Sequence, residues 1–454
     1  MEHLDEQERE QVWNEVEESL KEGKIDQFRA EFLELHPYDQ AKIFEELDEP
    51  LRKEVYMYVS PEEIADVMEH VDDVDVEPYF SEMDPRFASD VFSEMSSDDA
   101  VDIMNRLDKD KVASFLTIMG KEDAQEIKDL LHYEEKTAGS IMTTEYVSLR
   151  ASMKVKEAME HLRVEAPDAE TIYYTYVVDE EKKLAGVISL RDLIISEPEW
   201  TIEEAMSDRV VSVSVAKDQE EIAQMMRDYD FLALPVVDFQ NHLLGIITVD
   251  DIMDVMDEEA SDDYSKLAAI SDVDGPNDNA FISAKKRLPW LIALLFLGSL
   301  TASLINQFED QLNQVAILAI FIPLIAGMAG NTGTQALAVA VRGIATGEIR
   351  KQGKGRMLLR EASTGLITGV VCGVIITLVV YVWQGNFFLG ALVGISIMSA
   401  LIVATIAGSF VPLLMDRMNI DPAVASGPFI TTINDLISIL IYFGMASAFM
   451  NFLV

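Results

Sequence analysis

The chain has 454 residues with 35 basic and 80 acidic side chains, which gives a formal net charge of −45 at pH 7. A surface this acidic repels nucleic-acid phosphates and attracts cations, so composition excludes a nucleic-acid-binding protein. The single cysteine, Cys372, excludes a disulfide framework within the chain.

The acidic excess is confined to the first 280 residues. Residues 281–454 hold 10 basic and 7 acidic side chains, so residues 1–280 carry 25 basic and 73 acidic ones, a net charge of −48. The chain opens with MEHLDEQEREQVWNEVEESL, which is too charged for a secretory signal peptide. We therefore expect residues 1–280 to lie in the cytoplasm.

A twelve-residue repeat occupies residues 36–131, from the block HPYDQAKIFEEL to the block GKEDAQEIKDLL. The eighth and twelfth positions are apolar in every block, and the ninth is apolar in all but the last, where Lys128 stands. Most blocks open with Asp or Ser, which are good N-caps, and Pro37, Pro61 and Pro85 suit the first helical turn. The repeat predicts short capped helices that bury their apolar stripes by stacking into a superhelix of either hand.

Residues from about 138 to 257 alternate β-branched strands with amphipathic helices. TIYYTYVVD followed by KKLAGVISLRDLI is repeated as DFLALPVVD followed by HLLGIITVDDIM. Each copy predicts a strand, a turn, a second strand preceded by a glycine, and a helix. The pattern resembles a tandem pair of CBS domains, which form one pseudo-symmetric α/β module.

The same resemblance marks a nucleotide site. The motif Gly-hydrophobic-x-Ser/Thr-x-x-Asp occurs twice, at Gly186, Ser189 and Asp192 and at Gly245, Thr248 and Asp251. In CBS domains the Ser/Thr and Asp often hold an adenosine, and many pairs hold no ligand. The resemblance leaves both readings open for ATP, with Arg191 and Asp192 as the first contacts beside Ser189 and Thr248.

An acidic helix, DDIMDVMDEEASDDYSKLAAI, is predicted to continue the second CBS domain. The linker SDVDGPNDNA follows, and its Gly275 and Pro276 break any helix.

Five apolar segments predict five membrane spans: 288–307, 313–340, 362–383, 387–414 and 424–450. The basic residues of this region gather before the first span, between the second and third, and between the fourth and fifth: Lys285, Lys286, Arg287; Arg342, Arg350, Lys351, Lys354, Arg356, Arg360; Arg417. The positive-inside rule places the N-terminus in the cytoplasm and the C-terminus outside.

The last span contains Asp435 and no basic residue to pair with it. An acid at membrane depth costs about 2.5–3.5 kcal/mol and usually lines an ion path. The alternative is a carboxylate hydrogen-bonded to Thr431, Thr432 or Asn434. Nearby, Asp421 either caps a helix before Pro422 or contacts an ion at the cytoplasmic mouth.

The second span contains PLIAGMAGNTGTQ, with Pro323 able to break or bend the helix and small residues able to pack helices closely. Two amides, Asn331 and Gln335, favour a pore wall over simple packing. The residues that we expect to line this pore are Pro323, Gly327, Gly330, Asn331, Gly333, Gln335, Gly427 and Thr431.

Two membrane motifs, PxxxGxxGNxGxQ from Pro323 to Gln335 and DPAxxxGPxxTTxxD from Asp421 to Asp435, resemble those of the MgtE-type magnesium channels. The order of helical superhelix, CBS pair, acidic helix and five spans is similar too. The resemblance implies a homodimer in the lipid bilayer with one central pore, where Asp435 of each subunit holds a largely hydrated Mg²⁺.

The resemblance also implies feedback gating by cytoplasmic Mg²⁺ bound between acidic groups, with Asp98 and Asp102 sharing one helix face. Without the cation these groups repel one another, and with it they are bridged into a compact closed state. The expected sensor residues are Asp98, Asp102, Asp218, Glu220, Asp230, Asp251, Asp254, Glu259, Asp262 and Asp263. Each of them is otherwise a solvated surface acid.

The sequence therefore predicts a multidomain Mg²⁺ transporter of the plasma membrane, tuned by ATP if the CBS pair binds it. We expect four parts: a helical domain (1–135), the CBS pair (136–257), an acidic helix with its linker (258–280) and the membrane domain (281–454). The alternatives are broader divalent transport that includes Co²⁺ or Ca²⁺, and a membrane-anchored sensor of Mg²⁺ or adenine nucleotide. No Walker A motif or catalytic constellation is visible in the sequence, so we do not expect an enzyme.

Overall fold

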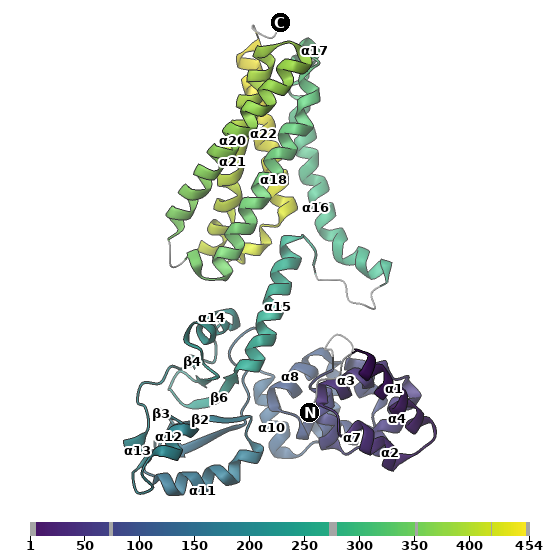
Figure 1. The fold of residues 1–454 in the computed structure, drawn as a ribbon, viewed down its shortest axis with the longest axis vertical. Helices are drawn as coiled ribbons and strands as arrows, with labels where there is room; N and C mark the ends of the chain where they lie inside the picture. Colours follow the sequence, from purple (N-terminus) through teal and green to yellow (C-terminus); the bar gives the residue numbers. More distant parts are fainter. Residues whose placement is uncertain (1–5, 72–75, 272–278, 350–352, 419, 451–454) are drawn as a thin grey trace. The chain divides into compact units, whose positions relative to one another are not determined.

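The computed structural model describes residues 6–71, 76–271, 279–349, 353–418 and 420–450, and it divides into two compact units, Met1–Met256 and Asp257–Val454 (Figure 1). Each unit is described by itself. The predicted helix breakers Gly275 and Pro276, and the basic residues Arg350 and Lys351, lie outside the described residues.

The first unit opens with α1 (Glu6–Lys21) and α2 (Ile25–Phe32). The predicted repeat then appears as one helix per block: α3 (Pro37–Glu46), α4 (Glu49–Tyr58), α5 (Pro61–Met68), α6 (Val76–Glu82), α7 (Pro85–Glu94), α8 (Ser97–Arg106), α9 (Lys109–Ile118) and α10 (Lys121–Leu130). Capping sets these starts: Ser60 and Glu63 form a capping box on α5, and the Asp84 carboxylate accepts the Arg86 N–H on α7.

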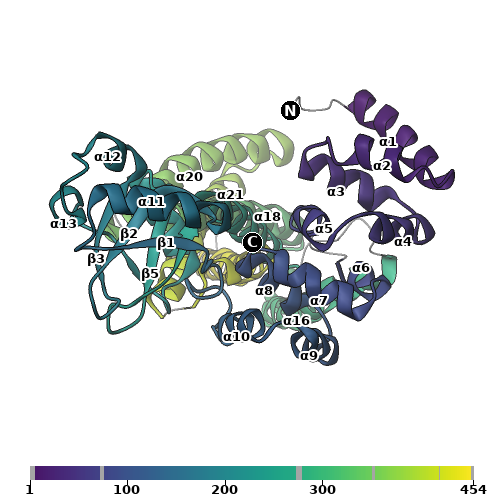
Figure 2. The same ribbon diagram turned by 90° about the horizontal axis from the view of Figure 1, so that it is seen from below.

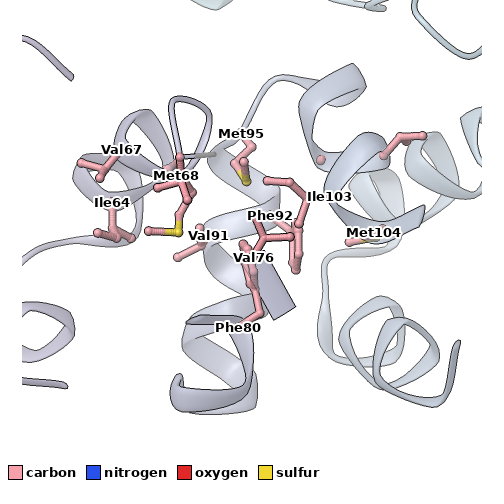
Figure 3. Close-up of a cluster of buried hydrophobic side chains, with 14 of the residues drawn as sticks. Ile64, Val67, Met68, Val76, Phe80, Val91, Phe92, Met95, Ile103 and Met104 are labelled. Atoms are coloured by element: carbon pink, nitrogen blue, oxygen red, sulfur yellow. The ribbon is translucent and has the colours of Figure 1, made fainter. Parts of the chain in front are cut away.

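The apolar stripe of each repeat helix is buried against its neighbours. Figure 3 shows part of this core, with the eighth and ninth positions of the third, fifth and sixth blocks: Val67 and Met68, Val91 and Phe92, Ile103 and Met104. The rings of Phe80 and Phe92 stack with centroids 4.4 Å apart. The stacking prediction is confirmed, since no single repeat could bury this stripe alone.

The CBS pair contains two three-stranded sheets. The first has the order β1 (Tyr146–Arg150), β2 (Thr171–Val178), β3 (Leu184–Ser189), and the second β4 (Val213–Ser214), β5 (Ala233–Val237), β6 (Leu243–Thr248). In each sheet the first pair is parallel and the second antiparallel. The helices are α11 (Val155–Glu165), η2 (Ala166–Asp168), α12 (Leu190–Ile195), α13 (Ile202–Ala205), α14 (Gln219–Tyr229) and α15 (Val249–Leu267), and both α11 and α12 lie against the first sheet (Figure 2).

Two glycines in these sheets correct a detail of the prediction. Gly186 and Gly245 do not precede their strands but lie inside β3 and β6. A methyl group on Gly186 would lie 2.3 Å from the Met206 sulfur, and one on Gly245 would lie 2.5 Å from the Thr143 carbonyl oxygen. Glycine is required at Gly245 because the Thr143 backbone crosses the strand there, whereas a side chain at Gly186 would displace the end of Met206.

In its described residues the second unit holds five helices long and apolar enough to cross a membrane: α16 (Ala280–Asn306), α18 (Leu318–Ala345), α20 (Lys354–Gln384), α21 (Phe387–Arg417) and α22 (Gly427–Ala448). The number of spans agrees with the prediction, but the predicted second segment contains a break, because α17 (Glu309–Gln314) is a separate short helix. The helix α18 runs through Pro323 without interruption. A 3₁₀ turn, η3 (Pro422–Val424), precedes α22.

Candidate functional site

Asp435 is the ninth residue of α22, about 12 Å along the helix from its first residue at 1.5 Å per residue. Its side chain is half-buried. The hydroxyls of Thr431 and Thr432 donate to the carbonyl oxygens of Gly427 and Pro428, so neither binds the carboxylate. Among the described residues the Asp435 carboxylate has no hydrogen bond and no ion pair. The predicted alternative, an acid bonded to its neighbours, is therefore not formed.

The helix α18 presents one exposed face at this part of the unit. Pro323, Gly327, Asn331 and Gln335 follow one another at intervals of four residues, and all four are exposed in the single chain. Amides at membrane depth are satisfied by water or by protein rather than by lipid. This face thus suits the wall of a water-filled path or contact with another subunit.

Gly330 and Gly333 lie on the opposite, buried face of α18. A methyl group on Gly333 would lie 1.8 Å from Nδ2 of Asn434, and one on Gly330 would lie 2.7 Å from Cγ2 of Thr431. The hydroxyls of Thr334 and Thr431 are 3.2 Å apart across the same interface. These glycines let α18 and α22 approach closely, and so they fix the rotation of the helix that carries Asp435.

The end of α15 contacts the beginning of the fifth span within the second unit. Lys266 Nζ lies 2.7 Å from Asp421 Oδ2 and 3.6 Å from Asp262 Oδ2. The other oxygen of Asp421 accepts the Ala423 N–H, which is the predicted capping role. Leu267 packs on the cluster formed by Leu337, Val341, Ala423, Ala425 and Ile430.

Asp263 belongs to the same contact. Burial and the neighbouring Asp421 raise the pKa of Asp263 to about 6. Gly427 lies here too, and a methyl group on it would be 3.3 Å from the Leu267 carbonyl oxygen. The end of α15 is thus held at the start of the fifth span by a short apolar and ionic contact.

In the first unit, Asp98 and Asp251 meet between the helical repeat and the CBS pair. Asp98 is 8% exposed, and its Oδ1 has no hydrogen-bond partner in the described part of the chain. Burial, followed by the charge of Asp251, raises the Asp98 pKa well above its usual value. The Thr248 hydroxyl donates to the Asp251 carboxylate, but burial still raises the Asp251 pKa.

Further carboxylates surround this pair. Burial raises the pKa of Glu69, Glu145 and Glu170 to about 7 each, and acidic neighbours including Asp99 add to every shift. The acidic junction, as we name it, comprises Glu69, Asp98, Asp99, Glu145, Glu170, Asp250 and Asp251. This concentration of carboxylates, in which Asp98 is buried and Glu170 is exposed, repels itself and is relieved by a cation or by protons.

Sequence reasoning missed five members of the acidic junction: Glu69, Asp99, Glu145, Glu170 and Asp250. One pair could have been predicted from the sequence. Glu145 and Glu170 each precede a strand, and those two strands are parallel neighbours in the sheet. Parallel neighbours begin at the same edge of a sheet, and the Glu170 N–H donates to the Glu145 carbonyl oxygen at 2.9 Å. Glu69 and Asp99 lie near this edge only through tertiary packing.

The other predicted sensor residues are dispersed. Asp102 is exposed on α8, Asp218 caps α14 by accepting the N–H groups of Glu220 and Glu221, and Asp230 is the left-handed cap at the end of α14. Asp254 is exposed on α15 in the first unit, whereas Glu259, Asp262 and Asp263 belong to the second. Among the described residues, no three Asp, Glu, His or Cys side chains are arranged as a ready-made metal site.

Comparison with protein families covers both units. Residues 35–136 match the MgtE intracellular N domain, residues 138–198 and 202–258 match CBS domains, and residues 322–445 match the MgtE divalent cation transporter domain. The chain is 53% identical over 439 residues to the magnesium transporter MgtE of Enterococcus faecalis, covering 96% of this chain and 97% of that one. The chain belongs to the MgtE family of magnesium transporters.

Two crystal structures of soluble regions are also similar. The soluble part of a magnesium transporter is 49% identical, with a TM-score of 0.54, over 56% of this chain and 99% of that one. The cytosolic domain of the Mg²⁺ channel MgtE in complex with ATP is 39% identical, with a TM-score of 0.51, over 54% of this chain and 99% of that one.

Membership in the MgtE family confirms the predicted fold class of helical N domain, CBS pair and five apolar helices. The chain is a multi-pass membrane transporter with an intracellular N domain, and it is not an enzyme.

The two CBS motifs differ in this MgtE family member. Ser189 donates to Asp192 at 2.6 Å, and both Asp192 and Arg191 are exposed. The matching residues Thr248 and Asp251 are enclosed, Thr248 being 3% exposed and Asp251 lying in the acidic junction. The first motif is therefore the one open to a ligand in this conformation.

Proposed function

We propose that the chain imports Mg²⁺ through a channel-like pore, down its electrochemical gradient, and that cytosolic Mg²⁺ closes this pore. The observation that carries the proposal is Asp435, a carboxylate at membrane depth with no partner among the described residues. It stands on the helix that packs against the amide-bearing α18. Mg²⁺ sheds its water reluctantly, so a carboxylate beside amides holds the hydrated ion by outer-sphere contacts and leaves it mobile.

The exposed face of Pro323, Gly327, Asn331 and Gln335 supports a homodimer with the pore between the subunits. A single chain leaves these polar groups at the surface of a membrane helix, and a second copy would enclose them. Gly330, Gly333, Gly427 and Thr431 then shape the wall from behind by setting the position of α22. The N-terminal domains face the cytoplasm in this arrangement, and the C-terminus lies outside.

Gating follows from the acidic junction and from α15. In the absence of Mg²⁺ the carboxylates of the acidic junction repel one another, and bound Mg²⁺ offsets that repulsion. The helix α15 runs from Val249 to Leu267 and carries Asp251 near its start and Lys266 near its end. A closed junction would hold the Leu267 end of α15 on the mouth of the pore.

ATP is proposed as a regulatory ligand of the first CBS motif, through Arg191, Asp192 and Ser189, because that motif is the open one. Titration calorimetry with ATP should show binding that Arg191→Gln removes and Arg209→Gln, an exposed arginine outside the motif, retains. We also propose that the chain has four domains, with the boundaries 1–135, 136–257, 258–280 and 281–454.

Mg²⁺ uptake into proteoliposomes tests the ion path. We expect Asp435→Asn to lose more than nine-tenths of the uptake, while Asp310→Asn, which changes an exposed acid of α17, retains it. Uptake by Asp435→Asn equal to that of the unmodified protein would move the path elsewhere. No uptake by any of the three proteins would favour a membrane-anchored sensor, and Co²⁺ or Ca²⁺ carried as well as Mg²⁺ would favour a broader transporter.

A further inference from the structure

A cavity of about 180 Å³ lies between the end of α18 and the start of α20, outside the candidate ion path. Seven residues line it: Val339, Arg342, Gly343, Glu348, Ile349, Met357 and Arg360. Its volume is several times the roughly 30 Å³ that one water occupies in the liquid. The cavity is therefore large enough for a polyatomic group.

The floor of the cavity is apolar and rigid. Ile349 is 6% exposed and Met357 is 5% exposed, and they form one buried cluster with Ala340 and Leu413. A methyl group on Gly343 would lie 2.9 Å from the Ile349 side chain, so the α18 backbone approaches this floor closely. The cavity is built by packing of structured elements.

Two arginines from different helices line this cavity. Arg342 lies in the last turn of α18, and none of the described residues pairs with its side chain. Arg360 lies in the second turn of α20, its Nε is 3.6 Å from Glu361 Oε1, and it donates no hydrogen bond to the described residues. Glu348 is the single acid among the lining residues, and it has an interaction of its own.

Paired arginines in a concave site recognise a phosphate, because each fork-shaped guanidinium offers two parallel N–H donors. Among the described residues, the Arg342 side chain has no partner, and that of Arg360 has only the 3.6 Å ion pair with Glu361. The chemistry of this cavity therefore points to an anion with several acceptor oxygens, and a phosphate monoester or diester has them.

The surroundings favour a lipid as the source of that phosphate. Beyond Arg360 the same face of α20 carries an exposed apolar stripe: Ile367, Val371, Val374 and Leu378, each between 52% and 66% exposed. These residues follow Arg360 at intervals of 7, 11, 14 and 18, which keeps them within about 40° of it around the helix. A phosphate bound at Arg360 would thus have its acyl chains along this stripe.

The position at the membrane agrees with a lipid as well. By the positive-inside rule this end of α18 and α20 is the cytoplasmic one. Anionic head groups attract basic residues at that surface, and basic pockets between membrane helices bind them. We propose that Arg342 and Arg360 bind the phosphate of an anionic phospholipid in the α18–α20 cavity.

Native mass spectrometry of the intact protein, released from mixed nanodiscs of phosphatidylglycerol and phosphatidylcholine, tests this proposal. The unmodified protein should retain phosphatidylglycerol preferentially. The preference should fall about fivefold with Arg342→Gln or Arg360→Gln, and by more with both, given the usual contribution of one basic residue at an anionic surface. Arg356→Gln is the matched control, since Arg356 is exposed on α20 one turn before Arg360 and does not line the cavity.

Three outcomes would overturn the proposal: a preference unchanged in the double variant, an equal loss in Arg356→Gln, or complete displacement of the lipid by millimolar inorganic phosphate. The second outcome would mean diffuse surface attraction, and the third a site for free phosphate. Arg342→Lys with Arg360→Lys guards against misfolding, because it keeps both charges and should keep part of the preference. Elution of every variant as the same species in size-exclusion chromatography completes the control.

Discussion

Lys266, in the last turn of α15, lies with its Nζ 2.7 Å from Oδ2 of Asp421, the residue that caps the turn before the fifth span. This ion pair and the packing of Leu267 are contacts that join the end of the acidic helix α15 to the start of the fifth span. A partly exposed ion pair contributes little by itself, about 0.5–1 kcal/mol. In an equilibrium between two states, that amount is still a measurable change of population.

Lys266→Met should release this contact. The substitution removes the charge that Asp421 faces and keeps an unbranched side chain one atom shorter, so the closed state loses about 0.5–1 kcal/mol. We expect Mg²⁺ flux at high internal Mg²⁺ to rise about two- to fivefold in proteoliposomes. Lys285→Met, at an exposed residue of α16, should leave the flux unchanged, and a flux equal in both variants would refute the role of this pair.

Asp98→Asn should stabilise the cytosolic region when Mg²⁺ is absent and reduce the stabilisation that Mg²⁺ gives. Asp98 is buried with one unpartnered oxygen among other acids, so the amide removes a repulsive charge at nearly the same volume. We expect a gain of about 1–2 kcal/mol in the free energy of unfolding of residues 1–270, measured in urea with EDTA. Asp102→Asn, one turn further along α8 and exposed, should change it by less than about 0.5 kcal/mol.

The same fragment should become less stable as pH rises from about 5 to 7 in EDTA. The folded-state pKa values of Glu69, Glu145 and Glu170 are about 7, above the usual 4.5, so the folded state binds more protons than the unfolded state across this window. Stability is therefore highest below about pH 5 and falls as these groups ionise. We expect a total loss of about 2 kcal/mol after allowance for solvent screening, with the smallest share from the exposed Glu170.

Urea titrations at pH 5, 6 and 7 measure this loss. Millimolar Mg²⁺ at pH 7 should restore most of it, because a divalent cation neutralises the same carboxylates. Stability that rises with pH, or that ignores Mg²⁺, would contradict the assignment of the acidic junction.

Gly333→Ala should separate α18 from α22. The added methyl group meets the Asn434 amide at 1.8 Å, and Asn434 is 1% exposed and cannot move aside. We expect a loss of about 1–3 kcal/mol, seen as a lower melting temperature of the detergent-solubilised protein. Gly298→Ala on α16 meets nothing within 4 Å and should be neutral or slightly stabilising. Equal melting temperatures for the two variants would show that α18 and α22 pack less closely at Gly333 than in the structure.

The repeat helices and the membrane spans could be predicted because their information is local. The period of twelve places a cap and an apolar pair in every block, and α3 to α10 begin twelve residues apart where the caps predict, with α6 beginning at the first described residue of its block. The ends of the helices were harder to predict from the sequence. The helix α16 begins at Ala280 instead of residue 288, because the Asn279 side chain caps it by accepting the N–H groups of Phe281 and Ile282.

The acidic junction could be predicted only in part. Asp98 and Asp251 stand out as acids on helices, but their convergence with Glu69, Glu145 and Glu170 depends on how the helical repeat packs on the CBS pair. The sequence also could not show which neighbour Gly330 and Gly333 face, because a glycine motif in a span can belong to a pore wall or to a contact between helices. The structure turns both glycines toward α22 and turns Asn331 and Gln335 outward.

The most direct test of the account is Mg²⁺ flux through the intact protein as a function of Mg²⁺ on the cytoplasmic side. Inward flux should be high at micromolar internal Mg²⁺, should fall at least tenfold at 10 mM, and should stay high at 10 mM in the double variant Asp98→Asn with Asp251→Asn. Flux that does not respond to internal Mg²⁺ in the unmodified protein would contradict gating by the acidic junction.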